Sequence, residues 1–270
     1  MHISLNLKGT ELKTTISILL LVLFFSVPQI GVGENWQQVD TNIHYKEVVR
    51  NYSWKKSRTA KYHVLRIKQG TYKLSVKSFH NLQQWQTTGI SELREKNNYL
   101  IVLSGGFFDP DFKKPVGLIV EKQKKVFNLT SKLSGVIWIK NNHLYLSPTD
   151  AFAYKKMRPD YAIQGYPRIV DPVNKPGIYK QSGPFLQRTA IGLSGDYIII
   201  MITDKLSDGV SLYELAMFAQ TSEKKGGLNC DIAVNLDGGP APGISVSPEL
   251  KRLEVKEEWQ VPNVFIIEKQ

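Results

Sequence analysis

The stretch Ile232-Ala-Val-Asn-Leu-Asp-Gly-Gly239 combines an apolar run with a polar, glycine-rich end. Its apolar first half predicts a buried strand. The two glycines predict a turn in which the backbone can approach a ligand closely. The stretch Tyr99-Leu-Ile-Val-Leu-Ser-Gly-Gly106 has the same order of features. We therefore expect two buried strands that each end in a Gly-Gly turn.

Apolar and β-branched runs of strand length recur along the rest of the chain, bounded by Gly, Pro, Asn and Lys, and such runs predict strands. Gln69 and Gly70 predict a hairpin-like turn between two of these runs, and Gly195 with Asp196 predicts a second hairpin. The expected strands, besides the two stretches quoted, are 43–49, 62–67, 72–76, 116–120, 126–129, 135–140, 143–146, 162–170, 188–193, 197–203 and 261–267.

Two segments, 89–96 and 212–221, have helical patterns. Ser211 and Glu214 have the spacing of a capping box, in which a hydroxyl and a carboxylate satisfy amides at a helix start. We therefore assign Glu214 to the helix start rather than to acid catalysis. Many strands and few helices, in a length that one domain can hold, predict a single-domain α+β fold. Its core is expected to be a mixed or antiparallel β-sheet flanked by a few helices, over residues 34–270.

The composition is that of a folded globular protein, with 42% hydrophobic and 22% charged residues. The 35 Lys and Arg outnumber the 24 Asp and Glu, giving a net charge of +11. Such a charge suits an anionic substrate, a polyanionic polymer, a membrane or a nucleic acid. No nucleic-acid-binding motif accompanies it, so no nucleic-acid partner is expected. Cys230 is the single cysteine, which excludes an intrachain disulfide and predicts a buried structural thiol.

Residues 1–33 have the order of a secretory signal peptide. Lys8 and Lys13 precede an apolar run at 16–27, and Gly31 and Gly33 supply small residues for cleavage. The run is about half of the roughly 20 residues that a membrane-spanning helix needs. We therefore expect an exported protein, periplasmic or secreted, with contact to a membrane only if this segment stays uncleaved as an anchor.

Polar residues at the ends of apolar strands are the candidates for chemistry. Asp237 follows an apolar strand, where an unpaired carboxylate is costly to bury, and the alternative is an Asx-type turn. Arg188 begins another strand, and its planar guanidinium suits phosphate or carboxylate, with a surface ion pair as the alternative. Asp204 directly follows the strand 197–203 and is a second acid-base candidate. The histidines show no metal-ligand spacing, so no cofactor is predicted, and a divalent cation between Asp204 and Asp237 is left open.

Five short motifs occur in this order: Ser104-Gly-Gly-Phe-Phe108, Pro115-Val-Gly-Leu-Ile119, Gly165-Tyr-Pro-Arg-Ile-Val170, Arg188-Thr-Ala-Ile-Gly192 and Asn235-Leu-Asp-Gly-Gly239. Together they resemble the phosphodiester glycosidase family. The segment 209–216 is also similar to the family's segment before its helix, so the resemblance runs from about residue 43 to residue 268. The chain departs from the family at Ser104, where Asn is usual, and at Pro240-Ala-Pro242, where the family has more Gly and Ser.

The resemblance implies hydrolysis of a sugar joined through its anomeric carbon to a phosphodiester, with envelope glycans as one source of that substrate. Such a reaction needs an anion-binding group and a carboxylate, so we assign Arg188 to the phosphate and Asp237 as the base or nucleophile, with Asp204 as a further catalytic candidate. The amides of Gly105, Gly106, Gly238 and Gly239 are expected to be supporting anion donors. The expected substrate-binding residues are Ser104, Gly105, Gly106, Gln164, Asn235, Gly238 and Gly239. The alternatives are a noncatalytic glycan- or polyanion-binding envelope protein with the same fold, and a structural protein of the envelope.

Overall fold

The computed structural model describes residues 35–79, 86–109, 111, 114–251 and 253–270. The expected signal peptide at 1–33 lies outside these residues, so it stays a prediction. Within the described ranges, no helix is long and apolar enough to cross a membrane.

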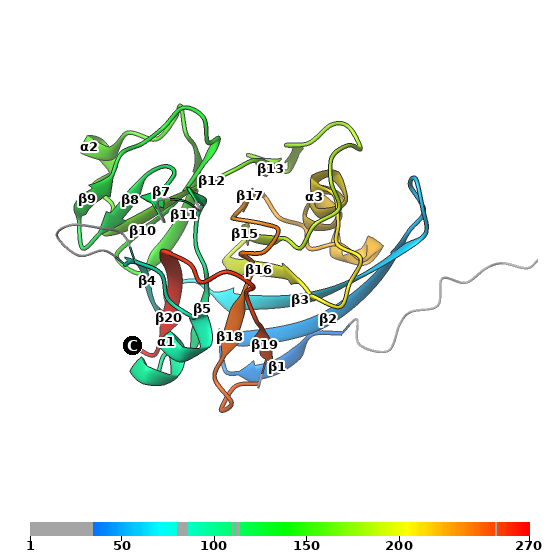
Figure 1. The fold of residues 1–270 in the computed structure, drawn as a ribbon, viewed down its shortest axis with the longest axis horizontal. Coiled ribbons are helices and arrows are strands. Elements are labelled where there is room, and N and C mark those ends of the chain that lie inside the picture. The colour runs from blue at the N-terminus through cyan, green and yellow to red at the C-terminus, as the bar shows by residue number, and fades with distance from the viewer. Residues whose placement is uncertain (1–34, 80–85, 110, 112–113, 252) are drawn as a thin grey trace, which may run out of the picture. The chain divides into compact units, whose positions relative to one another are not determined.

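The largest sheet has eight antiparallel strands in the order β1-β2-β3-β16-β15-β17-β13-β14 (Figure 1). Its last five strands bring segments from the second half of the chain beside the N-terminal hairpin β2–β3. The strands are β1 Gln37–Asp40, β2 Ile43–Tyr52, β3 Arg58–Lys68, β13 Arg168–Asp171, β14 Lys175–Pro176, β15 Thr189–Ser194, β16 Tyr197–Thr203 and β17 Ile232–Asn235.

Two five-stranded antiparallel sheets, in the orders β11-β10-β12-β8-β9 and β19-β18-β5-β20-β4, complete the core together with the short pair β6–β7. Their strands are β4 Lys73–Ser78, β5 Ile101–Ser104, β6 Phe108–Asp109, β7 Lys114–Pro115, β8 Ile119–Glu121, β9 Lys124–Phe127, β10 Gly135–Lys140, β11 His143–Pro148, β12 Tyr161–Gly165, β18 Ile244–Val246, β19 Leu253–Val255 and β20 Asn263–Glu268. The helices are α1 Ile90–Asn97, α2 Tyr154–Met157 and α3 Leu212–Gln220, with a 3-10 turn at Glu223–Lys225.

The eight-stranded sheet buries apolar residues on both faces because side chains alternate along each strand. On one face, Ile200 of β16 joins a core shared with residues of both smaller sheets, such as Ile137 and Phe265. On the other face, Met201 packs in a second core with Phe218 of α3. Helix α3 thus covers one side of the large sheet, where it contacts β13 and β14 (Figure 1).

The predicted antiparallel β core with few helices is confirmed, but the chain is mostly β, so the α+β label gives the helices too much weight. The capping box of α3 is also confirmed. The Glu214 amide donates to Ser211 Oγ at 3.1 Å, and the Ser211 amide donates to Glu214 Oε2 at 2.9 Å. The turn at Gly195 and Asp196 joins β15 to β16 as predicted. Cys230 is buried, and burial raises the pKa of its thiol.

The predicted hairpin at Gln69 and Gly70 is wrong. Strand β3 pairs with β2 on one edge and with β16 on the other, and a strand has only two edges. The chain therefore leaves the eight-stranded sheet after Gly70, and β4 pairs with β20 in another sheet.

The single strand expected at 162–170 is two strands in different sheets. Strand β12 ends at Gly165, and β13 begins at Arg168. Pro167 lies between them, and proline has no N–H to continue a strand ladder. The interruption places the Tyr166-Pro167 turn directly beside β17, where the Tyr166 amide donates to the Asn235 carbonyl at 2.9 Å.

Candidate functional site

Arg188 and Asp237 lie together because of the antiparallel pairing of β15 with β17. Arg188 immediately precedes β15, and Asp237 follows the end of β17 by two residues. The Leu236 amide donates to the Thr189 carbonyl at 2.8 Å and continues the ladder past the strand end. A methyl group at Gly238 would lie 3.1 Å from Arg188 Nη1. The guanidinium group therefore lies against the Asp-Gly-Gly turn.

The Arg188 side chain is buried, with a relative exposure of 7%. Its Nε donates to the Val210 carbonyl at 3.4 Å, and its Nη2 donates to the Pro184 carbonyl at 3.3 Å. Burial lowers the pKa of Arg188, and the nearby Asp237 carboxylate opposes that shift. Because arginine stays charged in proteins, this site holds a fixed positive charge in a largely desolvated place.

Asp237 is half-buried, and its Oδ1 accepts from the Gly238 amide at 2.8 Å. Burial raises the pKa of its carboxyl group to about 7, although the Gly238 amide and the Arg188 charge both act to lower it. No cation of the described residues lies within 4.0 Å of this carboxylate. A carboxyl group that titrates near neutral pH is suited to exchanging a proton with a substrate or a water molecule.

The first Gly-Gly turn lies directly against the second. The Gly105 carbonyl accepts from the Asp237 amide at 3.4 Å. The Gly105 amide donates to the Asn263 carbonyl at 3.1 Å, and the Gly106 amide donates to Asn263 Oδ1 at 2.7 Å. A methyl group at Gly105 would lie 2.0 Å from Asn263 Oδ1. Glycine is therefore required here by close packing.

The four glycine amides expected to bind phosphate all have partners within the protein. Those of Gly105 and Gly106 donate to Asn263, that of Gly238 donates to Asp237, and that of Gly239 donates to the Gln187 carbonyl at 3.1 Å. Each amide therefore has an acceptor within the protein, and its role as an anion donor stays a prediction. Of the predicted phosphate-binding groups, the structure keeps the Arg188 guanidinium at the site.

Ser104 and Gln164 support the site from inside the protein. Ser104 is fully buried, and its Oγ accepts from the Gly243 amide at 3.2 Å, which holds the loop after Asp237. Gln164 Oε1 accepts from the Leu118 amide at 2.8 Å and the Thr130 amide at 3.0 Å. Both side chains are buried and hydrogen-bonded to neighbouring loops, and their contacts to substrate stay predictions.

Asn235 lies within the site. Its Nδ2 donates to the Tyr166 carbonyl at 2.7 Å and to the Leu236 carbonyl at 2.6 Å. Its Oδ1 is buried and has no hydrogen-bond partner among the described residues. Buried acceptors are normally satisfied, so an unpaired one beside a candidate site is a feature that function can explain.

The structure does not bring Asp204 to Asp237. Asp204 Oδ2 lies 3.2 Å from His63 Nε2 and 3.6 Å from Lys61 Nζ, and its Oδ1 accepts from the Leu206 amide at 2.9 Å. Burial alone would raise the pKa of Asp204, but the Leu206 amide, His63 and Lys61 together hold it below its ordinary value. Neither aspartate contributes to the pKa shift of the other.

No group of three or more His, Cys, Asp or Glu side chains in the described part of the chain could hold a metal ion. The divalent cation considered between Asp204 and Asp237 therefore has no such cluster of ligands in the described residues.

Asn263, which binds the Gly105-Gly106 turn, was not among the residues predicted from the sequence. Its signal is an amide side chain at the start of an otherwise apolar final strand.

Comparisons with known proteins show which folds and which family this chain resembles. The fold is similar to the zebrafish N-acetylglucosamine-1-phosphodiester alpha-N-acetylglucosaminidase catalytic domain auto-inhibited by its pro-peptide, with a TM-score of 0.67 and 17% identity over 87% of this chain and 88% of that one. It is also similar to a hypothetical protein from Synechocystis, with a TM-score of 0.58 and 10% identity over 85% of this chain and 62% of that one. No curated protein sequence matches significantly. The phosphodiester glycosidase family model matches residues 97–268, more than half of the sequence, and the chain belongs to this family.

Proposed function

We propose that this protein is a glycosidase that hydrolyses the bond between the anomeric carbon of a sugar and the oxygen of a phosphodiester. The products are the free sugar and a phosphomonoester. Family membership supports the reaction class. The observation that carries the proposal is the placement of a carboxyl group with a pKa of about 7 beside a buried arginine.

The leaving group explains why one carboxyl group is enough. Ordinary glycosidases use a carboxylic acid to protonate a poor alkoxide leaving group and a second carboxylate as base or nucleophile. A phosphomonoester leaves as a stabilised anion, so the need for a strong general acid is small. The second carboxylate candidate, Asp204, is ion-paired away from Asp237.

Asp237 acts on the sugar side of the scissile bond. In its ionised form it either removes a proton from a water molecule that attacks the anomeric carbon, or attacks that carbon itself and is released by water in a second step. In both routes the carbon-oxygen bond breaks, and its electron pair leaves with the phosphate oxygen. The water oxygen ends on the sugar.

Arg188 acts on the phosphate side. Its guanidinium is buried and is oriented by the Val210 and Pro184 carbonyls. A preorganised positive charge in a desolvated site stabilises negative charge that develops on a leaving group. Asn235 is as buried as Gln164, so it supports the site from inside the protein: its Nδ2 binds the Tyr166 and Leu236 carbonyls next to the Asp237 turn.

The test is a product assay on a panel of sugar-1-phosphodiesters, with Asp204→Asn and Asp237→Asn as a matched pair. We expect sugar and phosphomonoester in equal amounts from at least one substrate, a similar rate with Asp204→Asn, and a large loss with Asp237→Asn. Binding of these substrates without turnover by the wild type would instead favour the noncatalytic glycan-binding alternative.

We further propose that the protein acts outside the cytoplasm, on phosphodiester-linked sugars of the cell envelope. The support is the basic and apolar order of residues 1–33 together with the net charge of +11, which suits anionic polymers. Intact-mass measurement of protein from the native envelope should give a chain that begins near residue 34. A mass that includes residues 1–33 would contradict the cleavage.

A further inference from the structure

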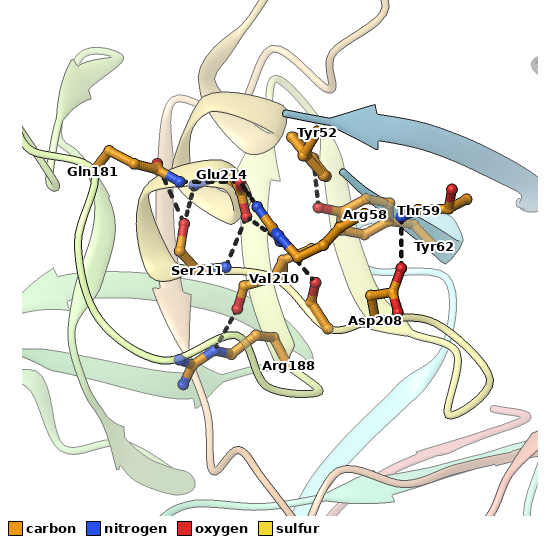
Figure 2. Close-up of polar contacts among 11 residues, drawn as sticks. Tyr52, Arg58, Thr59, Tyr62, Gln181, Arg188, Asp208, Val210, Ser211 and Glu214 are labelled. Atoms are coloured by element: carbon orange, nitrogen blue, oxygen red, sulfur yellow. Dashed lines mark hydrogen bonds and ion pairs between the residues drawn. The ribbon is translucent and has the colours of Figure 1, made fainter. Parts of the chain in front are cut away.

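We propose that the buried ion pair between Arg58 and Glu214 positions the Arg188 guanidinium for anion binding. This inference rests on the role proposed for Arg188. Figure 2 shows the pair and its partners. Arg58 comes from the start of β3 and Glu214 from the first turn of α3, so the pair joins residues far apart in the sequence.

Two backbone carbonyls determine where the Arg188 side chain lies. Val210 accepts from Nε and Pro184 accepts from Nη2. Both carbonyls belong to irregular segments, one before α3 and one before β15, and these two segments pair through reciprocal backbone bonds between Leu186 and Val210 at 2.9 and 3.2 Å. The direction of the guanidinium therefore depends on what holds these segments.

The Arg58–Glu214 pair holds both neighbours of Val210. Arg58 Nη1 donates to the Gly209 carbonyl at 3.2 Å and to Glu214 Oε2 at 3.1 Å, and Glu214 Oε2 also accepts from the Ser211 amide at 2.9 Å. Arg58 Nη2 completes a two-pronged contact with Glu214 Oε1. Because residues 209 and 211 are both bound, the Val210 carbonyl between them has a fixed direction.

The same pair holds the segment that carries Pro184. The Arg58 guanidinium lies over the Phe185 ring, 3.5 Å from its centroid. Gln181 Nε2 donates to Glu214 Oε1 at 3.0 Å. Both acceptors of the Arg188 side chain are thus adjacent to groups that contact Arg58 or Glu214. Figure 2 shows this for Val210.

Helix capping does not account for this arrangement. A capping box needs only the serine and the glutamate, whereas here the glutamate is also paired with an arginine, and the two side chains are 6% and 0% exposed. A buried ion pair is often no more stabilising than apolar residues of the same volume. A forked arginine-carboxylate contact does provide geometric precision. We therefore infer that Arg58 and Glu214 are positioning residues.

The titration of Asp237 gives a test that needs no substrate. The Arg188 charge lowers the pKa of Asp237, so displacement of the guanidinium raises that pKa. The experiment follows the Asp237 carboxyl carbon by NMR across pH in the wild type, Arg58→Lys and Glu214→Gln, with Arg188→Gln as the reference for complete loss. The control is Arg94→Lys, because Arg94 is another buried arginine, which donates to Ser245 Oγ at 2.8 Å.

We expect the pKa of Asp237 to rise by about half a unit in Arg58→Lys, which keeps the net charge, and to stay unchanged in Arg94→Lys. Glu214→Gln should also raise it, although removal of a negative charge acting directly would lower it. Added to Arg188→Gln, neither substitution should cause a further rise, because both act through Arg188. A wild-type titration of Asp237 in folded Arg58→Lys and Glu214→Gln would overturn the proposal.

If these two variants do not fold, Gln181→Met takes their place, because Gln181 is only half-buried. We expect a smaller rise in the pKa of Asp237, and an unchanged pKa would contradict the inference.

Hydrolysis provides the second measurement. Arg58→Lys should lower kcat/KM about tenfold in the wild-type background and have little effect in Arg188→Lys. If no phosphodiester is hydrolysed by the wild type, the proposed function fails, while the titration still decides the role of the pair.

Discussion

Two aspartates follow strands on either side of β15 in the same sheet, and their surroundings are opposite. Asp204 lies after β16 and contacts His63, Lys61 and the Leu206 amide, which lower its pKa. Asp237 lies after β17, accepts one hydrogen bond from its own turn, and has a pKa of about 7. Position at a strand end therefore does not by itself determine the pKa of an aspartate.

The comparison distinguishes a carboxylate that stabilises the fold from one whose pKa suits proton transfer. A carboxylate whose charge is matched by partners stabilises the fold and holds its proton weakly. A buried carboxylate with too few partners for its negative charge destabilises the folded protein when it is ionised. Groups of this kind are concentrated at functional sites. This difference supports the catalytic role proposed for Asp237, whereas Asp204 bonds to side chains of β3.

The largest expected effect is the loss of activity in Asp237→Asn. Removal of the positioned proton acceptor or nucleophile should lower kcat/KM by about two to four powers of ten, while the protein stays folded. The measurement is steady-state kinetics on a confirmed phosphodiester, with circular dichroism to check folding. An unfolded variant would support a purely structural turn, and an active one would exclude Asp237 as the essential group.

Arg188→Lys should have the next largest effect, because it keeps the charge but replaces a planar fork with a point charge. We expect kcat/KM to fall by roughly 10- to 100-fold. Inhibition by inorganic phosphate should weaken in parallel. Unchanged kinetics and unchanged phosphate inhibition would remove Arg188 from the phosphate site.

The pH dependence of stability should differ in sign between the two aspartates. The pKa of Asp237 is raised in the folded protein. The contribution of this group to the free energy of unfolding is therefore complete below pH 3.8, its ordinary pKa, and is lost as the pH rises through about 7. Between pH 4 and pH 8 the stability of Asp237→Asn should therefore increase relative to the wild type by a few kcal/mol, at about 1.4 kcal/mol per unit of pKa shift.

The pKa of Asp204 is lowered in the folded protein. Its contribution to the free energy of unfolding is therefore present at pH values above its ordinary pKa and is lost as the pH falls below that pKa. Asp204→Asn should therefore lose stability relative to the wild type at neutral pH and recover that difference in acid. Urea unfolding of both variants from pH 3 to pH 8 measures both curves. Two curves of the same sign would remove the distinction between the two aspartates.

The smallest expected effect is that of Asp204→Asn on stability at pH 7. The amide keeps a side-chain oxygen for the Leu206 amide but loses the charge that faces Lys61 and His63. We expect a loss of about 1 kcal/mol in the free energy of unfolding, with kcat/KM within about twofold of the wild type. A loss of activity as large as that of Asp237→Asn would restore Asp204 as a catalytic residue.

Local patterns predicted the local structure well. The capping box at Ser211 and Glu214 and the turn at Gly195 depend on residues adjacent in sequence, and both appear as expected. The hairpin at Gly70 was wrong because the pairing of β3 is decided by β16, which comes from the second half of the chain. A turn motif carries no information about which edges a distant strand occupies.

The sequence singled out the charged residues of the candidate site but not the residues that hold them in place. Arg188 and Asp237 stand out as polar residues at the ends of apolar strands, and the pairing of β15 with β17 brings them together. The roles of Ser104, Gln164 and the four glycines depend on partners such as Gly243 and Asn263, which tertiary folding alone supplies. The departure at Ser104 concerns an internal contact, because its hydroxyl binds the loop after Asp237.

Hydrolysis in ¹⁸O-labelled water tests the central claim most directly, because it shows which bond breaks. If Asp237 directs water to the anomeric carbon, or attacks that carbon itself, the label enters the released sugar and the phosphomonoester contains none. The reaction should be stopped early, since free sugars exchange their anomeric oxygen with water slowly whereas phosphate oxygens do not. Label in the phosphomonoester would mean attack at phosphorus, and would contradict the mechanism proposed for Asp237 and Arg188.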